Sequence, residues 1–322
     1  MFAVFAESFS PESPLDGLVL GERPDPVAPE GWTTVTVKAA SLNHHDLFSL
    51  RGVGLKQEQL PMILGCDAAG LDEDGNEVVV HAVISDPSWR GDETFDPKRS
   101  LLSERHQGTL ADKVVVPLRN VVPKPASLSF AEAACLPTAW LTAYRMLFTR
   151  GGLKAGDTVL VQGAGGGVSS ACIILARAAG LKVLATSRDE AKRAKALEIG
   201  AHDVFESGAR LPVKVDAVME TVGRATWSHS IRALRPGGTI VTSGTTSGPQ
   251  LDDAELTRIF FLQLSVVGST MGTRDELASL VSLLDATGTK PLIDREVALT
   301  DAREGFAAMA GGDVFGKIVF TN

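Results

Sequence analysis

The chain of 322 residues lacks most features of secreted, membrane and nucleic-acid-binding proteins. Its three cysteines, an odd and small number, provide no disulfide framework and indicate a reducing compartment, so we expect a cytoplasmic protein. No apolar run has the length of a membrane span, and the first residues lack the pattern of a signal peptide. The net charge of −8 argues against a nucleic-acid partner and against an anionic membrane surface.

Two kinds of sequence indicate two domains. Short alternating, β-branched segments typical of strands occupy the first third, such as Thr33–Ala39 and Lys113–Pro117. After them, apolar strands alternate with helical segments, which predicts a doubly wound parallel sheet. We therefore expect an α/β protein with a β-rich substrate domain of residues 1–122 and 273–322, and a Rossmann domain of residues 123–272.

The expected parallel sheet has five apolar strands, at Thr158–Gln162, Lys182–Thr186, Val215–Glu220, Thr239–Ser243 and Leu264–Ser269. After a helix at Arg274–Asp285, the tail returns to strand-like pieces that end with Phe315–Thr321. This return predicts that the tail rejoins the first domain.

A glycine-rich turn provides the strongest functional signal. The sequence VLVQGAGGGVSSACIILARAAG, from Val159, runs from a buried strand through glycines into a helix. Backbone amides at such a helix start can bind a diphosphate, provided that no side chain blocks the approach. A GxGxxG match is weak alone, but this strand–turn–helix context supports a dinucleotide site. The alternative is a tight connection with no ligand.

The end of the next strand favours NADPH over NADH. NAD sites usually place Asp or Glu there, to bind the ribose 2′-hydroxyl. Here the strand ends in Thr186 and Ser187, and Arg188 and Lys192 provide positive charge for a 2′-phosphate. The alternative is that Asp189 binds the ribose while the two cations are solvated.

Several segments, in order along the chain, resemble the medium-chain dehydrogenase/reductase superfamily and in particular its zinc-free quinone oxidoreductase branch. They include SLNHHDLFSLRG from Ser41, LPMILGCDAAG from Leu60, LPTAWLTAYRML from Leu136 and FGKIVF near the end. The resemblance implies a GroES-like substrate domain, a Rossmann domain and an active site between them. It also implies a phosphate-binding role for Lys192. The chain departs from the usual glycine turn at Ser169, where we expect little effect because serine is small.

The resemblance and the pattern together give the candidate cofactor-binding residues, which are Thr142, Gly163, Gly165, Gly166, Gly167, Val168, Ser187, Arg188, Lys192, Val222, Gly223 and Gly244. Thr142 is expected beside the nicotinamide by resemblance, with a helix-internal hydrogen bond as the alternative. Gly223 and Gly244 follow strands at the edge where the cofactor crosses, although they could be ordinary turn glycines.

The sequence predicts no metal site. At the positions of the catalytic zinc ligands of related alcohol dehydrogenases stand Asn43, Cys66-Asp67 and Thr138, a poor zinc donor set. The stretch Asp86–Gly108, which matches their structural zinc lobe, contains no cysteine.

Without a metal, the chemistry must rely on placement and hydrogen bonds. The predicted catalytic residues are Asn43, His44, Asp46 and Thr138, with His45 as a further candidate donor. His44 and His45 are adjacent, so on a strand they would point to opposite faces, and surface or hydrogen-bonding histidines are commoner than metal ligands. The alternative for Asn43 and Asp46 is turn capping.

Three functions remain open. The first is NADPH-dependent reduction of a quinone, and the second is reduction of the carbon–carbon double bond of an alkenal or enoyl substrate. The third is a redox-inert NADPH-binding protein. The apolar edge segment Leu264–Ser269 also predicts a homodimer, unless a loop covers it.

Overall fold

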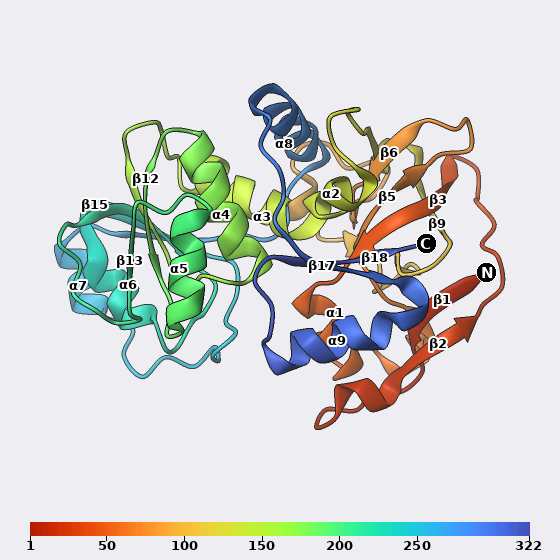
Figure 1. Cartoon of the computed structure of the whole chain (residues 1–322), viewed down its shortest axis with the longest axis horizontal. Coiled ribbons are helices and arrows are strands. Elements are labelled where there is room, and N and C mark those ends of the chain that lie inside the picture. Colours follow the sequence, from red (N-terminus) through yellow and green to blue (C-terminus); the bar gives the residue numbers. More distant parts are fainter. The chain divides into compact units, whose positions relative to one another are not determined.

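The computed structural model describes all residues, 1–322, and divides them into two compact units (Figure 1). The first unit comprises Met1–Leu141 and Met271–Asn322, and the second comprises Thr142–Thr270. The first boundary lies at Leu141 and not at residue 122. The intervening segment stays with the first unit because its helix α2 (Phe130–Ala134) packs on that unit's strands.

The first unit is built on a seven-stranded sheet of order β10-β6-β5-β3-β18-β17, in which β9 also pairs with β3. Its strands are β3 (Trp32–Ser41), β5 (Asp67–Leu71), β6 (Glu77–Val80), β9 (Lys113–Pro117), β10 (Val121–Pro123), β17 (Ile293–Ala298) and β18 (Lys317–Thr321). A three-stranded sheet holds β1 (Phe2–Ala6), β2 (Leu18–Glu22) and β4 (Met62–Ile63), and β7 (Val83–Ile84) pairs with β8 (Ser100–Leu101).

The C-terminal tail belongs to this unit through β18, which pairs antiparallel with β3 and parallel with β17. Helix α9 (Ala302–Gly311) covers the tail strand, and the rings of Phe306 and Phe320 stack with centroids 6.1 Å apart. Gly305 allows this close packing, because a Cβ at that position would lie 2.7 Å from the Phe320 ring.

Two helices of the first unit contradict the expected strands and turns. Helix α1 (His44–Leu50) contains both histidines, so they do not lie on a strand. At its start Asn43 and Asp46 have the spacing of a capping box, and the Asp46 carboxylate accepts a hydrogen bond from the Asn43 amide. Helix α9 replaces part of the expected strand-like tail. Helix α8 (Arg274–Thr287) begins where expected and ends at Gly288.

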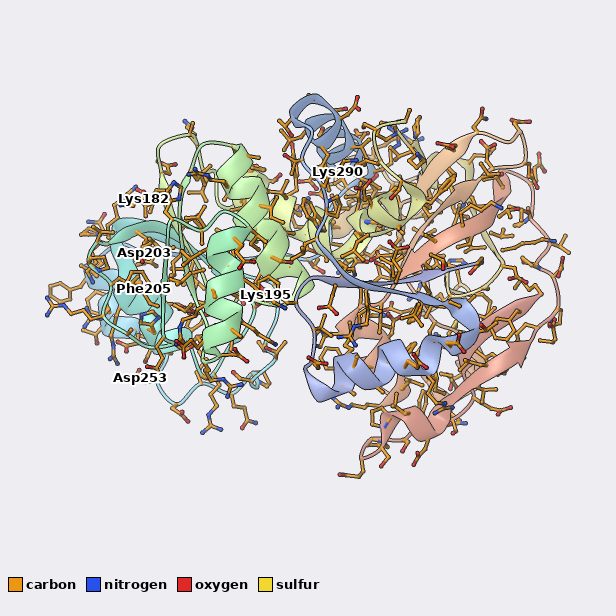
Figure 2. All side chains as sticks on the ribbon, in the orientation of Figure 1. Lys182, Lys195, Asp203, Phe205, Asp253 and Lys290 are labelled. Carbon is orange, nitrogen blue, oxygen red and sulfur yellow. The ribbon has the colours of Figure 1, made fainter.

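The second unit has a six-stranded parallel sheet of order β13-β12-β11-β14-β15-β16, which is the doubly wound Rossmann order. Its strands are β11 (Thr158–Val161), β12 (Lys182–Thr186), β13 (Asp203–Phe205), β14 (Val215–Glu220), β15 (Leu234–Thr242) and β16 (Ser265–Gly268). Five were expected, and short β13 was missed. Charged side chains such as Lys182 and Asp253 lie on the surface of this unit (Figure 2).

The helices of the second unit are α4 (Gly167–Ala178), α5 (Glu190–Glu198), α6 (Trp227–Ala233) and α7 (Leu256–Phe261). Helix α3 (Leu141–Tyr144) also belongs to this unit, except for its first residue, which is the last of the first segment of the other unit. Residues 129–149 do not form one continuous helix, because π-helical turns occupy η5 (Leu136–Trp140) and η6 (Arg145–Arg150). Pro137 lacks an amide hydrogen and contributes to this break. No helix is both long and apolar enough to cross a membrane.

Candidate functional site

The phosphate loop of the second unit joins β11 to α4 and has the backbone that a diphosphate site requires. Gly163 and Gly165 have φ angles of 69° and 127°, which side chains rarely allow. A Cβ at Gly163 would lie only 2.6 Å from Val222 Cγ2, so this position has no room for a larger residue. Gly166 caps the 12-residue helix α4, whose first residues are Gly167 and Val168. The loop therefore fits a bound diphosphate at a helix start.

The departure at Ser169 stabilises this loop. The Ser169 hydroxyl is within 3.0 Å of the carbonyl oxygens of Gly163 and Gly166, and a hydroxyl can donate to either. The side chain is buried and its nearest contacts lie within the loop itself. Serine thus supplies a hydrogen bond at a position where glycine supplies only close packing.

The tip of β12 carries the residues expected to select the nucleotide. Ser187 is buried and Arg188 is exposed. The Asp189 carboxylate accepts a hydrogen bond of 3.0 Å from the Lys192 amide and so caps α5, and this bond lowers the pKa of Asp189. Arg193, which the sequence reasoning missed, donates to the carbonyl oxygen of Ser187 at 2.8 Å. Asp189 therefore has a structural role as the cap of α5, which is a different role from ribose binding.

A buried carboxylate holds the loop after β14. Glu220 accepts hydrogen bonds from the amides of Val222 and Gly223, at 2.7 and 3.0 Å. It also accepts from the hydroxyls of Thr226 and Ser230. By accepting these hydrogen bonds from neutral donors, the Glu220 carboxylate fixes the Val222–Gly223 turn. In the neighbouring loop after β15, a Cβ at Gly244 would lie 3.2 Å from the Thr221 carbonyl oxygen.

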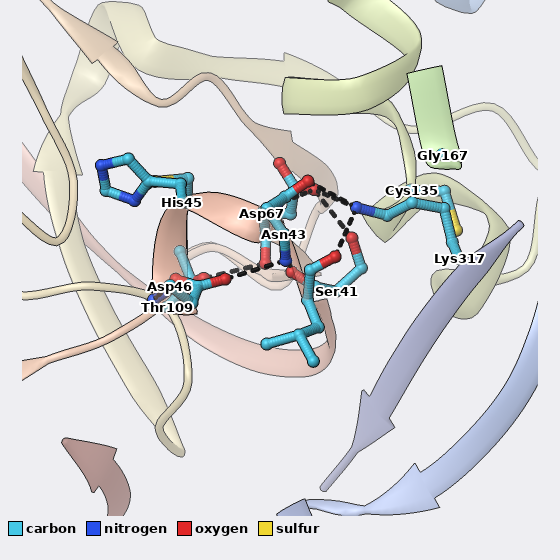
Figure 3. A network of polar contacts seen from close by, with 12 residues as sticks. Ser41, Asn43, His45, Asp46, Asp67, Thr109, Cys135, Gly167 and Lys317 are labelled. Carbon is cyan, nitrogen blue, oxygen red and sulfur yellow. Dashed lines mark hydrogen bonds and ion pairs between the residues drawn. The ribbon is translucent and has the colours of Figure 1, made fainter. Parts of the chain in front are cut away.

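In the first unit, four buried side chains form a polar cluster, which consists of Ser41, Asn43, Asp67 and Lys317 (Figure 3). Lys317 Nζ donates to the Leu42 carbonyl oxygen at 2.8 Å, to Asn43 Oδ1 at 2.7 Å and to Asp67 Oδ2 at 3.2 Å. Asp67 Oδ2 also accepts from the Ser41 hydroxyl at 2.7 Å. The ammonium therefore has an acceptor for each of its three protons.

Asn43 and Asp46 have structural contacts that use most of their hydrogen-bonding capacity. Asn43 Nδ2 donates to Asp67 Oδ2 at 2.8 Å, while its oxygen accepts from Lys317. The fully buried Asp46 carboxylate accepts from the amides of Asn43 and Gly65, both at 2.9 Å. Burial raises the pKa of Asp46, and these amide bonds oppose that increase. The contacts favour the capping interpretation for Asp46, whereas the Asn43 side chain is used within the polar cluster.

The two histidines of α1 differ in surroundings. His44 is exposed, whereas His45 lies between Glu104 and Cys66, with ring nitrogens 3.2 Å from Glu104 Oε1 and 3.6 Å from Cys66 Sγ. Burial raises the pKa of the Cys66 thiol, which donates to the Leu102 carbonyl oxygen at 3.2 Å. His44 is therefore the member of the pair that remains available to a ligand.

Thr138 and Thr142 lie on the broken helix, one in each unit. Thr138 is on the π-helical turn η5, and its buried hydroxyl has no hydrogen-bond partner. An unpartnered buried hydroxyl is costly, and π-helical turns are frequent at functional sites. Thr142 is buried in α3. Thr138 is thus the predicted catalytic residue with a free donor and acceptor.

The sequence matches two family models of known proteins. One family model, the alcohol dehydrogenase GroES-like domain, matches residues 29–126, and another, the zinc-binding dehydrogenase, matches residues 167–286. A zinc-type alcohol dehydrogenase-like protein, YogA of Leptosphaeria maculans, is 30% identical over 88% of this chain and 89% of its own length. The chain belongs to the medium-chain dehydrogenase/reductase superfamily. It is therefore an oxidoreductase with a GroES-like and a Rossmann-type domain.

Other relatives in the superfamily differ in the reactions that their names state. An acryloyl-coenzyme A reductase of Sulfurisphaera tokodaii is 28% identical over 95% of this chain and 97% of its own. A quinone oxidoreductase of Mus musculus is 28% identical over 87% of this chain and 85% of its own. The crystal structure of an NAD-dependent alcohol dehydrogenase superposes with a TM-score of 0.91, at 31% identity and full coverage of both chains.

The zinc ligands used by other superfamily members have no matching donor set in this chain. Asp67 is bonded to Lys317, the thiol of Cys66 donates to a carbonyl, and Asn43 and Thr138 are neutral. No cluster of three or more His, Cys, Asp and Glu side chains has the arrangement of a metal site. The residues present therefore do not fit a catalytic zinc ion.

Sequence reasoning did not identify Lys317 or Glu220 as functional residues. A single lysine in the apolar strand FGKIVF was the available signal, because a charge among buried strand residues needs a partner. Its partners lie 250 and 274 positions away, so the sequence offered no way to name them.

We predict that Lys317→Met lowers the free energy of unfolding by about 3–5 kcal/mol, because it leaves the buried Asp67 carboxylate without its counterion. Adding Asp67→Leu should recover part of that loss. Denaturant titration measures both changes. Lys113→Met, which removes an exposed ion pair with Asp25, is the matched control and should have little effect. Equal stability of wild type and Lys317→Met would contradict the assigned role of the ion pair.

Proposed function

We propose that the protein reduces a quinone-type acceptor with a hydride from NADPH and without a metal ion. The main support is the phosphate loop of Gly163 and Gly165, followed at the next strand tip by Ser187, Arg188 and Lys192. Bound NADPH would supply the hydride at its nicotinamide ring. The quinone oxidoreductase relatives perform a reaction of this class according to their names.

Each part of the chain has a separate task in this proposal. The phosphate loop binds the diphosphate, with Gly166, Gly167 and Val168 at the helix start, and Arg188 and Lys192 bind the 2′-phosphate. The turns at Val222, Gly223 and Gly244, together with Thr142, line the rest of the dinucleotide site.

The chemistry of the acceptor determines which hydrogen-bond and proton donors the protein must provide. A hydride added to an electron-poor carbon pushes an electron pair onto a carbonyl oxygen, which then takes a proton. The Thr138 hydroxyl, which lacks a partner, is the group that we assign to hydrogen bonding with this oxygen. His44 is exposed and provides a route for the proton from solvent. Asn43 and Asp46 act indirectly, by fixing the start of α1.

The second candidate is reduction of a carbon–carbon double bond conjugated to a carbonyl group. The acryloyl-coenzyme A reductase relatives support it, because they match nearly the full length of the chain. Both reactions require the same hydride transfer and the same charge on a carbonyl oxygen. They differ only in the acceptor.

We predict that the protein oxidises NADPH in the presence of a quinone or an α,β-unsaturated carbonyl compound, and that chelator treatment leaves the rate unchanged. Absorbance at the nicotinamide band measures the rate across both acceptor classes. A faster rate with enones would favour the second candidate. NADPH binding without oxidation by any acceptor would identify a redox-inert protein and overturn the proposal.

The double change Arg188→Ala with Lys192→Ala should weaken NADPH binding by roughly 10- to 1,000-fold and leave NADH binding nearly unchanged. The reason is the loss of two partly exposed charge-assisted contacts, each worth about 1.5–3 kcal/mol at most. Calorimetric titration with both nucleotides measures the difference. Lys182→Ala, an exposed cation at the opposite end of β12, is the control. Equal affinity of the wild type for NADH and NADPH would assign the ribose to Asp189 instead.

We also propose a homodimer through the edge strand β16, which lies at the end of its sheet and pairs only with β15. Large apolar side chains beside this edge are exposed, with Phe260 at 65% and Phe261 at 72%. Such a patch is unusual for a monomer. Light scattering at micromolar concentration should show a dimer for the wild type and a monomer for Phe261→Asp. Leu118→Asp, an equally drastic exposed change in the first unit, should remain dimeric, and a monomeric wild type would refute the proposal.

A further inference from the structure

A small polar hollow lies in the first unit, away from the polar cluster of Ser41, Asn43, Asp67 and Lys317. Its volume is about 170 Å³, and its lining includes Ser85, Glu93, Arg119 and Arg274. Pockets for drug-sized ligands usually measure about 300–1,000 Å³, so this one suits a single small group. The residues come from four separate segments that the fold brings together.

Two guanidinium groups give the hollow a positive charge. Arg119 is fixed by hydrogen bonds to the carbonyl oxygen and hydroxyl of Ser85, and it pairs with no carboxylate. Arg274 has only a weak contact of 3.4 Å with Asp275, whose side chain is 92% exposed. Each guanidinium therefore keeps N–H groups for a ligand, and planar guanidinium groups suit oxyanions.

The other polar groups of the lining are compatible with an oxyanion. His81 Nε2 donates to the Gly272 carbonyl oxygen at 3.0 Å, and burial lowers the pKa of His81 to about 4, so its ring is neutral near pH 7. Ser85 is buried, and its hydroxyl accepts from Arg119, which leaves its own proton to donate. Arg274 is the first residue of the 14-residue helix α8, so the positive end of the helix dipole adds to the charge there.

Glu93 is the one acidic residue of the lining, and it does not act as an internal counterion. No oxygen of Glu93 lies within ion-pair distance of either arginine. The lining therefore carries two positively charged groups and one negatively charged group, so its formal charge is positive. In a protein with a net charge of −8, this hollow is a locally positive site that attracts anions.

From this geometry we propose that the hollow of Ser85, Arg119 and Arg274 is a binding site for a phosphate group. The group contacts the two guanidiniums and the Ser85 hydroxyl, and Glu93 weakens its binding by repulsion. The phosphate is either free in solution or carried on the tail of a substrate. The site does not depend on the function proposed above, because phosphate binding requires no turnover.

Calorimetric titration with inorganic phosphate tests the site, in the presence of saturating NADP⁺ so that phosphate positions of the Rossmann unit are filled. Arg119→Gln and Arg274→Gln should each weaken phosphate binding by roughly 10- to 100-fold, as expected for loss of a charge-assisted contact. Glu93→Gln should tighten it. Arg210→Gln, the same chemical change at an exposed position of the second unit, should have no effect.

Steady-state kinetics with two acceptors distinguishes the sources of the phosphate. If it belongs to a substrate, Arg119→Gln should raise KM for an enoyl thioester of coenzyme A, which carries phosphates, and not for a neutral quinone. If it is a free ion, neither KM should change while phosphate affinity falls. Absence of phosphate binding by the wild type, or equal binding by the wild type and both arginine variants, would overturn the proposal.

Discussion

The buried ion pair between Lys317 and Asp67 is the interaction on which the first unit most depends. It joins the last strand, β18, to the start of β5 and to the turn before α1, segments that are distant in sequence. An ammonium and a carboxylate are both costly to bury unless each is fully hydrogen-bonded. Here the ammonium meets this condition with three acceptors. The Asp67 carboxylate meets it at Oδ2 only, since Oδ1 has no partner, so the carboxylate depends on the donors that the other two segments bring to Oδ2.

The position of this ammonium explains the local chemistry. Asn43 and Asp67 stand at positions where the resemblance to zinc alcohol dehydrogenases implies metal ligands, and here both side chains bond to a fixed cation of the protein itself. These contacts occupy Asn43 Oδ1 and Asp67 Oδ2, whereas Asp67 Oδ1 has no hydrogen-bond partner. What remains for a substrate is the unpartnered Thr138 hydroxyl on a π-helical turn, which makes this segment the focus of the proposed chemistry.

The second unit depends on a different constraint, the close approach of backbone segments around the phosphate loop. Gly163 lies against Val222. The buried Glu220 carboxylate holds the loop that contains Val222. Small residues at the loop and a buried acid beside it thus act together. A larger residue at Gly163 would displace the loop to which we assign the diphosphate.

Local signals predicted the Rossmann sheet well, because its strands are apolar runs and the helices after β11 and β12 stop at Gly180 and Gly200. They failed where tertiary packing decides the structure. Helix α9 contains Gly305, which weakens helix propensity but allows contact with Phe320. Helix α1 has only seven residues, although its Asn43-to-Asp46 spacing is a capping pattern. Partners of Lys317 could not be predicted, because they lie far away in sequence.

The most direct test of metal-independent hydride transfer is the primary isotope effect on NADPH oxidation. Chelator-treated protein is given NADPH with either hydrogen or deuterium at the transferred position of nicotinamide C4, together with a quinone or enone acceptor under single-turnover conditions. Direct hydride transfer predicts slower oxidation of the deuterated cofactor, and deuterium in the enone product at the carbon that accepts the hydride. Loss of activity after chelation that zinc restores, or a product without deuterium, would contradict it.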